Sequence, residues 1–326
     1  MNRRPCVVFR GSWVVGGMLI HVLLTGSVFG EPRTPNPESR TSVGVLVIAH
    51  GGSTRWNRAV RQTLKGSELA LPAEAAFGMG MQAEEVQRFQ QAVAKLEAQG
   101  VGRIAVIPLL VSSHSEVYRQ YEYLFGLRDR AEWPQAGPPL QVHVPVVMGH
   151  ALDDDPVVAE IVLERARALG RHPSQETVVL VAHGPNDEAD NAQWLASLRR
   201  VAQHLTQTGG FAQVLSLTIR DDASHAVRED AKQALRQAVQ AAGRHHSVLV
   251  VPVLMAQGGI EHKIPKLLKG LSYRYSGQTL LPHPKLAEWI AQQASRLAQP
   301  SPTRYALAPL DFLRTSDDEH GGTLWE

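Results

Sequence analysis

The chain is poor in cysteine: among its 326 residues the only thiol belongs to Cys6. Cys6 lies before an apolar N-terminal stretch that we expect to be removed, so the mature chain would carry no thiol. A chain without cysteine forms no disulfide and cannot hold an iron–sulfur cluster through thiolates. We therefore expect no iron–sulfur cofactor.

The chain also lacks the marks of proteins that bind nucleic acids or nucleotides. Aromatic residues make up 6%, the formal net charge is +2, and no basic stripe with interleaved aromatics is present, so no nucleic-acid partner is expected. Neither a GxGxxG motif after a strand-like run nor a GxxxxGK[ST] motif occurs, which leaves a nucleotide cofactor without support. A GxSxG motif is absent too, so the His-Gly-Gly sequence at 50–52 is not the oxyanion loop of a serine hydrolase.

Charge is missing from residues 11–30, which follow three arginines near the N-terminus. A basic start, an apolar middle and small residues at the end are typical of a secretory signal peptide. We expect cleavage after Gly30 and export to the periplasm or the extracellular space. The alternative is an uncleaved membrane anchor, since the stretch is nearly long enough to span a bilayer. Contact with a membrane would then occur only through this leader.

Two β-branched apolar runs, residues 43–50 and 177–183, both end in Ala-His followed by glycine. A run that is apolar at every position is typical of a strand buried on both faces of a parallel sheet. Ligands of such sheets bind beyond the carboxyl ends of the strands, which is where His50 and His183 lie. The glycine after each histidine permits a sharp turn and the close approach of a flat ligand. Alternatively, each histidine only caps its strand through a backbone hydrogen bond.

Further apolar runs and helical stretches are repeated along the chain. The remaining predicted strands are at 68–77, 103–111, 142–147, 213–219, 247–255 and 279–281, with helices at 83–99, 157–169, 224–242 and 285–297. Strands that alternate with helices at this spacing predict an α/β fold with two duplicated halves, each a four-stranded parallel sheet flanked by helices. The predicted halves are residues 43–172 and 173–298. A linker at 31–42 and a disordered tail at 299–326 complete the chain.

A histidine and a carboxylate follow the strand at 103–111. His114 and Glu116 are two residues apart at a predicted strand-to-helix junction. An imidazole and a carboxylate that face one crevice can bind a divalent cation of the first transition row. The alternative is a helix N-terminus, with Ser112, Ser113 or Ser115 as N-cap and Glu116 in the first turn.

The matching loop of the second half supplies the same residue types in reversed order. Glu261 and His262 follow Gly258 and Gly259, which permit a tight loop over the face of a ligand. The alternative is a glycine-rich connection with a solvated Glu-His-Lys sequence.

The order and duplication of these motifs resemble the type II tetrapyrrole chelatases, the sirohydrochlorin chelatases of the CbiX and SirB type. The similarity covers roughly residues 43–297, and the segment 111–117 is also similar to the metal-site loop of protoporphyrin ferrochelatases. This resemblance implies a chelatase-like fold with a tetrapyrrole cleft between the halves. It also implies insertion of Co²⁺ or Fe²⁺, a divalent metal that is a substrate, into a tetrapyrrole such as sirohydrochlorin.

The resemblance also implies roles for individual residues. His50, His114 and Glu116 correspond to the catalytic and metal-binding set, and the first half is expected to be the active one. Possible equivalents in the second half are His183 with Glu261 or His262, although Ile260 stands where the family has a histidine. The residues expected to contact the substrate are Gly51, Ser113, Gly184, Gly258 and Gly259.

Two other functions stay open at this point. The leader favours an exported carrier of a divalent metal or of a tetrapyrrole, built on the chelatase fold and without turnover. A structural protein that uses the duplicated fold only as a scaffold is the third possibility.

Overall fold

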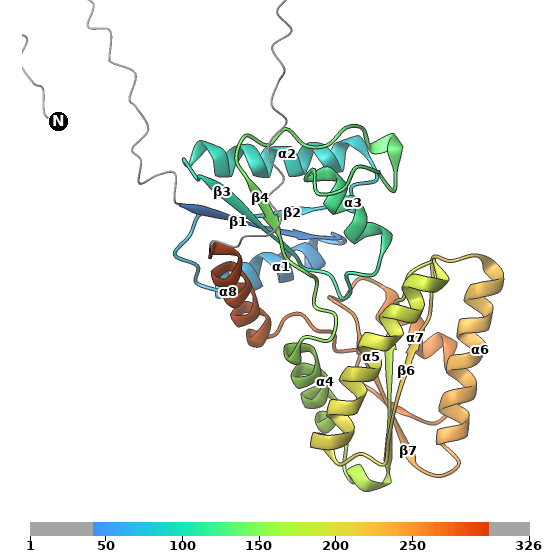
Figure 1. Cartoon of the computed structure of the whole chain (residues 1–326). Helices are drawn as coiled ribbons and strands as arrows, with labels where there is room; N and C mark the ends of the chain where they lie inside the picture. The colour runs from blue at the N-terminus through green and yellow to red at the C-terminus, as the bar shows by residue number, and fades with distance from the viewer. Residues whose placement is uncertain (1–41, 300–326) are drawn as a thin grey trace, which may run out of the picture. The chain divides into compact units, whose positions relative to one another are not determined.

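The computed structural model describes residues 42–299, which all fall in one compact unit (Figure 1). The predicted leader, nearly all of the predicted linker and nearly all of the predicted tail lie outside these residues. No helix within 42–299 is long and apolar enough to cross a membrane.

Two parallel sheets of four strands each are present in the described range, as the duplicated motifs predict. The strand orders are β2-β1-β3-β4 and β6-β5-β7-β8. The strands are β1 (Val43–Ala49), β2 (Ala73–Phe77), β3 (Arg103–Pro108), β4 (Val146–Met148), β5 (Glu176–Ala182), β6 (Gln213–Thr218), β7 (Ser247–Val253) and β8 (Arg274–Tyr275).

The helices lie between the strands, so each half follows the predicted βα alternation. They are α1 (Thr54–Gly66), α2 (Ala83–Ala98), α3 (Glu116–Leu124), α4 (Pro156–Leu169), α5 (Glu188–Gly209), α6 (His225–Ala242), α7 (Ile260–Leu267) and α8 (Pro284–Ala298). Short 3₁₀ turns occur at Pro134–Ala136 and Pro173–Gln175.

The two Ala-His-Gly runs form the strands β1 and β5, which are buried at all seven positions. Each lies inside its sheet with a parallel neighbour on both sides, so both of its faces are covered by helices. This burial explains why residues 43–49 and 178–182 are apolar or small at every position, rather than alternating with polar residues. It also brings the residues that follow β1 and β5 to corresponding places in the two sheets.

Helices α4 and α8 pack on the sheet of the other half. α8 contacts α1 and β3 of the first sheet, whereas α4 contacts α5 and β7 of the second (Figure 1). One hydrophobic cluster consequently includes Val45 of β1 and Val178 of β5, together with Ile161 of α4 and Ile290 of α8. The two halves that the sequence repeat defines therefore share a hydrophobic core and do not pack independently.

One predicted strand is wrong. Residues 279–281 form no strand, and the last strand of the second sheet is β8, Arg274–Tyr275. The amides of Leu280 and Leu281 donate to the carbonyls of Leu254 and Met255, beyond the end of β7. Residue 282 is a proline, which has no N–H to continue such a ladder. The apolar character of this segment reflects burial in the shared core and not strand pairing.

Candidate functional site

His50 and His183 occupy the residue directly after β1 and β5. The glycines that follow have φ +80° at Gly51 and φ +78° at Gly184, the left-handed region in which glycine is favoured. A Cβ on Gly184 would come within 2.6 Å of the Cβ of Thr218. The predicted sharp turn after each histidine is therefore confirmed, and at Gly184 it also requires the absence of a side chain.

The two rings make the same local contact. His50 Nδ1 lies 2.7 Å from the carbonyl oxygen of Gly51, and His183 Nδ1 lies 2.8 Å from that of Gly184. A carbonyl oxygen only accepts a hydrogen bond, so Nδ1 carries the proton and donates it. In the neutral ring this leaves a lone pair on Nε2, the nitrogen able to bind a metal or accept a proton.

Asp222, which the sequence analysis did not single out, lies at the Nε2 side of His183. Its Oδ2 is 3.3 Å from His183 Nε2. The side chain of Asp222 is 70% exposed and that of His183 is 30% exposed, so the pair lies at the surface of the strand-end region. His50 also acts electrostatically on Asp222. Both repeat histidines thus influence a single carboxylate.

The pair shifts the pKa of both its members. Burial lowers the pKa of His183, but the hydrogen bond and negative charge of Asp222 outweigh burial, and the net pKa is raised above the ordinary histidine value. The hydrogen bond to His183 lowers the pKa of Asp222, with the positive charges of His183, Lys263 and His50 acting in the same direction. The pair therefore favours an imidazolium beside a carboxylate.

Arg220 fixes the turn that carries Asp222. It is a buried residue with φ +47°, and its guanidinium donates to the carbonyls of Pro185 and Asn186 and pairs with Glu188. These contacts join the end of β6 to the loop that follows His183. The sequence signal that could have found Asp222 is the Arg-Asp-Asp run directly after an apolar strand, at the carboxyl end where ligands bind.

The first half has no carboxylate at the equivalent place. Phe77 pairs with Ala49 in the first sheet as Thr218 pairs with Ala182 in the second. Four residues further on, Met81 therefore corresponds to Asp222. The strand-end acid is a property of the second half, although the first half was predicted to be the active one.

The loop with His114 and Glu116 contains the helix N-terminus that was the alternative interpretation. Ser115 is the N-cap of α3, its side chain accepts from the amide of Tyr118, and Glu116 is the first helical residue. His114 and Glu116 are both partly exposed. Among residues 42–299, no group of three or more His, Cys, Asp and Glu side chains is arranged to hold a metal ion. A metal site of His50, His114 and Glu116 accordingly remains a prediction.

Ser113, which is predicted to contact the substrate, makes hydrogen bonds within the protein. Its amide and hydroxyl donate to the two oxygens of Asp153 at 2.7 and 2.8 Å, and the hydroxyl accepts from the amide of Ala151. Ser112 also donates to Asp153. These bonds tie the His114 loop to the loop that follows β4.

Glu261 is buried rather than solvated, so the alternative interpretation of this loop is wrong for this residue. Its Oε2 accepts from the amides of Gly258 and Gly259 at 3.1 and 2.9 Å, and its Oε1 lies 3.4 Å from Nε2 of His262, which is exposed. The carboxylate thus shapes the glycine loop. A Cβ on Gly258 would lie 3.3 Å from the ring of Trp56 in α1, so this loop lies against the N-terminus of α1, close to His50 in the sequence.

The comparisons with known proteins agree with this geometry. Residues 44–169 match the family model CbiX. SirB from Bacillus subtilis, solved with Fe³⁺, is 19% identical, with a TM-score of 0.55 over 79% of this chain and 96% of its own. A multi-domain protein of Deinococcus radiodurans, described as structurally similar to chelatases, is 18% identical over 79% of this chain and 55% of its own, with a TM-score of 0.46. No curated protein matches.

The chain has a duplicated α/β fold with a histidine directly after β1 and after β5, and it shares this fold with SirB. Residues 44–169 resemble the CbiX family, and the chain is similar in fold to SirB. The predicted resemblance to the type II chelatases is thereby confirmed.

Proposed function

We propose that this protein inserts Co²⁺ or Fe²⁺ into a tetrapyrrole such as sirohydrochlorin. The observation that carries the proposal is the 3.3 Å contact of His183 Nε2 with Asp222 Oδ2, directly after a strand that repeats the β1 run ending before His50. The CbiX match and the fold shared with SirB support the same class of reaction.

The chemistry of metal insertion suits these groups. The macrocycle loses two pyrrole protons as the divalent cation enters, so the site must accept protons near neutral pH. Neutral His183 can take a proton on Nε2, and Asp222 then stabilises the imidazolium that forms. The lone pair on Nε2 of His50 can hold the incoming cation weakly, as an imidazole does. His114 and Glu116 are the further metal ligands that the family resemblance implies.

The test is a turnover assay with sirohydrochlorin and Co²⁺ or Fe²⁺, followed by the absorbance change of the macrocycle. His183→Ala should reduce kcat by about a hundredfold, the lower end of the usual effect of a lost general base. His245→Ala is the matched control, because His245 is exposed in the turn between α6 and β7. Wild-type turnover by His183→Ala would contradict the assigned role.

The second candidate function is an exported carrier without turnover, which the uncharged stretch at 11–30 favours. A carrier would bind one metal or one metallated tetrapyrrole per chain and release it slowly. The same assay separates the two, since a catalyst forms many equivalents of product per chain and a carrier at most one.

Export itself is part of the proposal. The arginines and the apolar stretch before Gly30 support cleavage by a signal peptidase. Sequencing the N-terminus of the protein recovered from the periplasm or the medium should give Glu31 as the first residue. An intact N-terminus in the membrane fraction would instead support the uncleaved anchor.

A further inference from the structure

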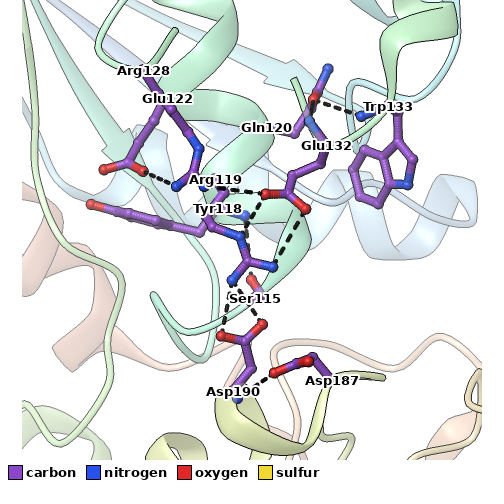
Figure 2. Close-up of polar contacts among 10 residues, drawn as sticks. All are labelled: Ser115, Tyr118, Arg119, Gln120, Glu122, Arg128, Glu132, Trp133, Asp187 and Asp190. Carbon is purple, nitrogen blue, oxygen red and sulfur yellow. Dashed lines mark hydrogen bonds and ion pairs between the residues drawn. The ribbon is translucent and has the colours of Figure 1, made fainter. Parts of the chain in front are cut away.

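Arg119 joins the two halves next to the candidate site. It lies in the first turn of α3, directly after the loop that carries His114. Its Nη1 donates to both carboxylate oxygens of Asp190 at 2.9 and 2.7 Å, and its Nε donates to Glu132 at 2.7 Å (Figure 2). Asp190 lies in the first turn of α5, the helix that follows the His183 loop. One guanidinium therefore connects the helices that begin after the two histidine loops.

The pair of Arg119 and Asp190 is shielded from water. The side chain of Arg119 is 23% exposed and that of Asp190 is 14% exposed. Charge-assisted hydrogen bonds at such a place are stronger and less screened by salt than surface ion pairs. Burial lowers the pKa of Arg119, but its bonds to Glu132 and Asp190 outweigh burial and raise it. The cation is permanent, so the contact does not depend on pH near neutrality.

Both carboxylates are themselves held in place. Asp187, the N-cap of α5, accepts from the amide of Asp190 at 2.9 Å. On the other side, the buried Gln120 accepts from the amides of Glu132 and Trp133 (Figure 2). Gln120 also donates to the carbonyl of Gly80. A continuous chain of polar contacts thus runs from the loop after β2 to the start of α5. Movement of either half would have to break a bidentate contact between ordered groups.

We propose that Arg119 is a positioning residue that sets the separation between the loops carrying His114 and His183. The substrate part of this proposal rests on the proposed function: a rigid macrocycle bound between those loops requires a defined gap. Loss of the contact with Asp190 lets the gap vary, which weakens substrate binding before it affects the chemical step.

The separation can be measured directly in the full chain. Nitroxide labels at Gln91→Cys in α2 and Gln237→Cys in α6, both exposed positions, report on the two halves in a Cys6→Ser background. In the doubly labelled chain, double electron–electron resonance should give a narrow distribution of the distance between the labels. When Asp190→Asn is added, this distribution should become broader. Asp190→Asn removes the partner charge on α5 and leaves the contact of Arg119 with Glu132.

The matched control is Arg128→Ala. Arg128 contacts Glu122 and Glu132 in the same region (Figure 2), and its recorded partners do not include Asp190, so the distribution should stay narrow. Asp190→Glu keeps the charge and should restore most of the narrow distribution. An unchanged distribution in Asp190→Asn overturns the proposal.

Kinetics provide the second readout. With Asp190→Asn we expect KM for the tetrapyrrole to rise about tenfold while kcat stays within about twofold, the pattern of lost uniform binding. Unchanged KM alongside a broadened distribution overturns the positioning role. If the unaltered chain inserts no metal at all, the proposed function fails, and the distance distribution alone decides whether Arg119 holds the two loops in place.

Discussion

At the scale of single residues, Asp222 gives the second-half histidine a role that the first half does not duplicate. Its charge stabilises the protonated form of His183, whereas the corresponding residue of the first half is Met81, which has no charge. A duplicated chain needs only one proton-accepting pair, so the acid at one strand end and its absence at the other fit a division of labour. In the division that we propose, His50 would supply a ligand for the cation and His183 would accept protons.

The pH dependence of turnover tests the role of Asp222. The raised pKa of His183 means that turnover falls as the pH drops through that value, because the protonated ring accepts nothing. Asp222→Asn removes the cause of the rise and leaves burial, which lowers the pKa. The acid limb of the profile of kcat against pH should therefore move to lower pH. A limb that stays in place would show that His183 is not the group that titrates.

The same pair affects stability with a defined sign. The folded pKa of His183 exceeds the unfolded value of about 6.5, so its contribution is complete below that pH and is lost as the pH rises through the folded value. Asp222→Asn should consequently lower the free energy of unfolding at pH about 5 more than at pH about 9. Urea titrations at the two pH values measure the difference.

The glycine at the second strand end can be tested by a pair of substitutions. Gly184→Ala places a side chain at φ +78° and a Cβ 2.6 Å from Thr218, whereas Gly210→Ala places one at φ +69° with nothing within 4 Å. Gly210→Ala should cost about 1 kcal/mol of stability from backbone strain alone. Gly184→Ala should cost about 3 kcal/mol, since the clash adds to the strain. Equal losses would contradict the close contact with Thr218.

At the scale of the elements, α4 and α8 illustrate what periodicity can and cannot predict. Both helices were expected from apolar spacing, and both lie close to the predicted ranges. That each helix packs on the sheet of the other half was not expected. An apolar face shows that a helix packs on another element, but it does not show which element. One of the contacts that join them is a hydrogen bond from the indole nitrogen of Trp289 in α8 to Asp155, the N-cap of α4.

The contribution of that hydrogen bond to stability can be measured by comparing substitutions of two tryptophans of similar burial. Trp289→Phe removes the donor to Asp155 and should cost about 1.5–3 kcal/mol beyond the loss of ring area, as for a hydrogen bond to a charged group. Trp194→Phe is the control, because its buried indole nitrogen has no hydrogen-bond partner. Chemical denaturation should rank Trp289→Phe as clearly less stable. A larger loss in Trp194→Phe would contradict this account of the exchanged helices.

At the scale of the whole described chain, the shared hydrophobic cluster couples the two sheets. Since β1, β5, α4 and α8 contribute to one cluster, the stability of one sheet depends on elements that follow the other in sequence. The halves recognised from the repeat at 43–172 and 173–298 are therefore not expected to unfold one after the other. This coupling also keeps the two histidine-bearing strand ends in a fixed relation, together with Arg119 and Asp190.

Calorimetry tests this coupling. Thermal unfolding of the full chain should give one transition whose calorimetric and van't Hoff enthalpies agree. Deletion of residues 284–326 removes α8 and exposes the face of the first sheet that it covers, so the amides of β1 and β3 should exchange faster with solvent. Two well-separated transitions in the full chain would show that the sheets are independent.

The sequence by itself determined the buried strands β1 and β5, the duplication and the histidines at their ends, because burial on both faces and a glycine turn leave a local pattern. Only the tertiary structure decided which helix covers which sheet, and that the carboxylate beside His183 comes from the turn after β6. Such pairings join residues far apart in the chain, so they depend on packing and on the geometry of neighbouring strands. No local pattern records them.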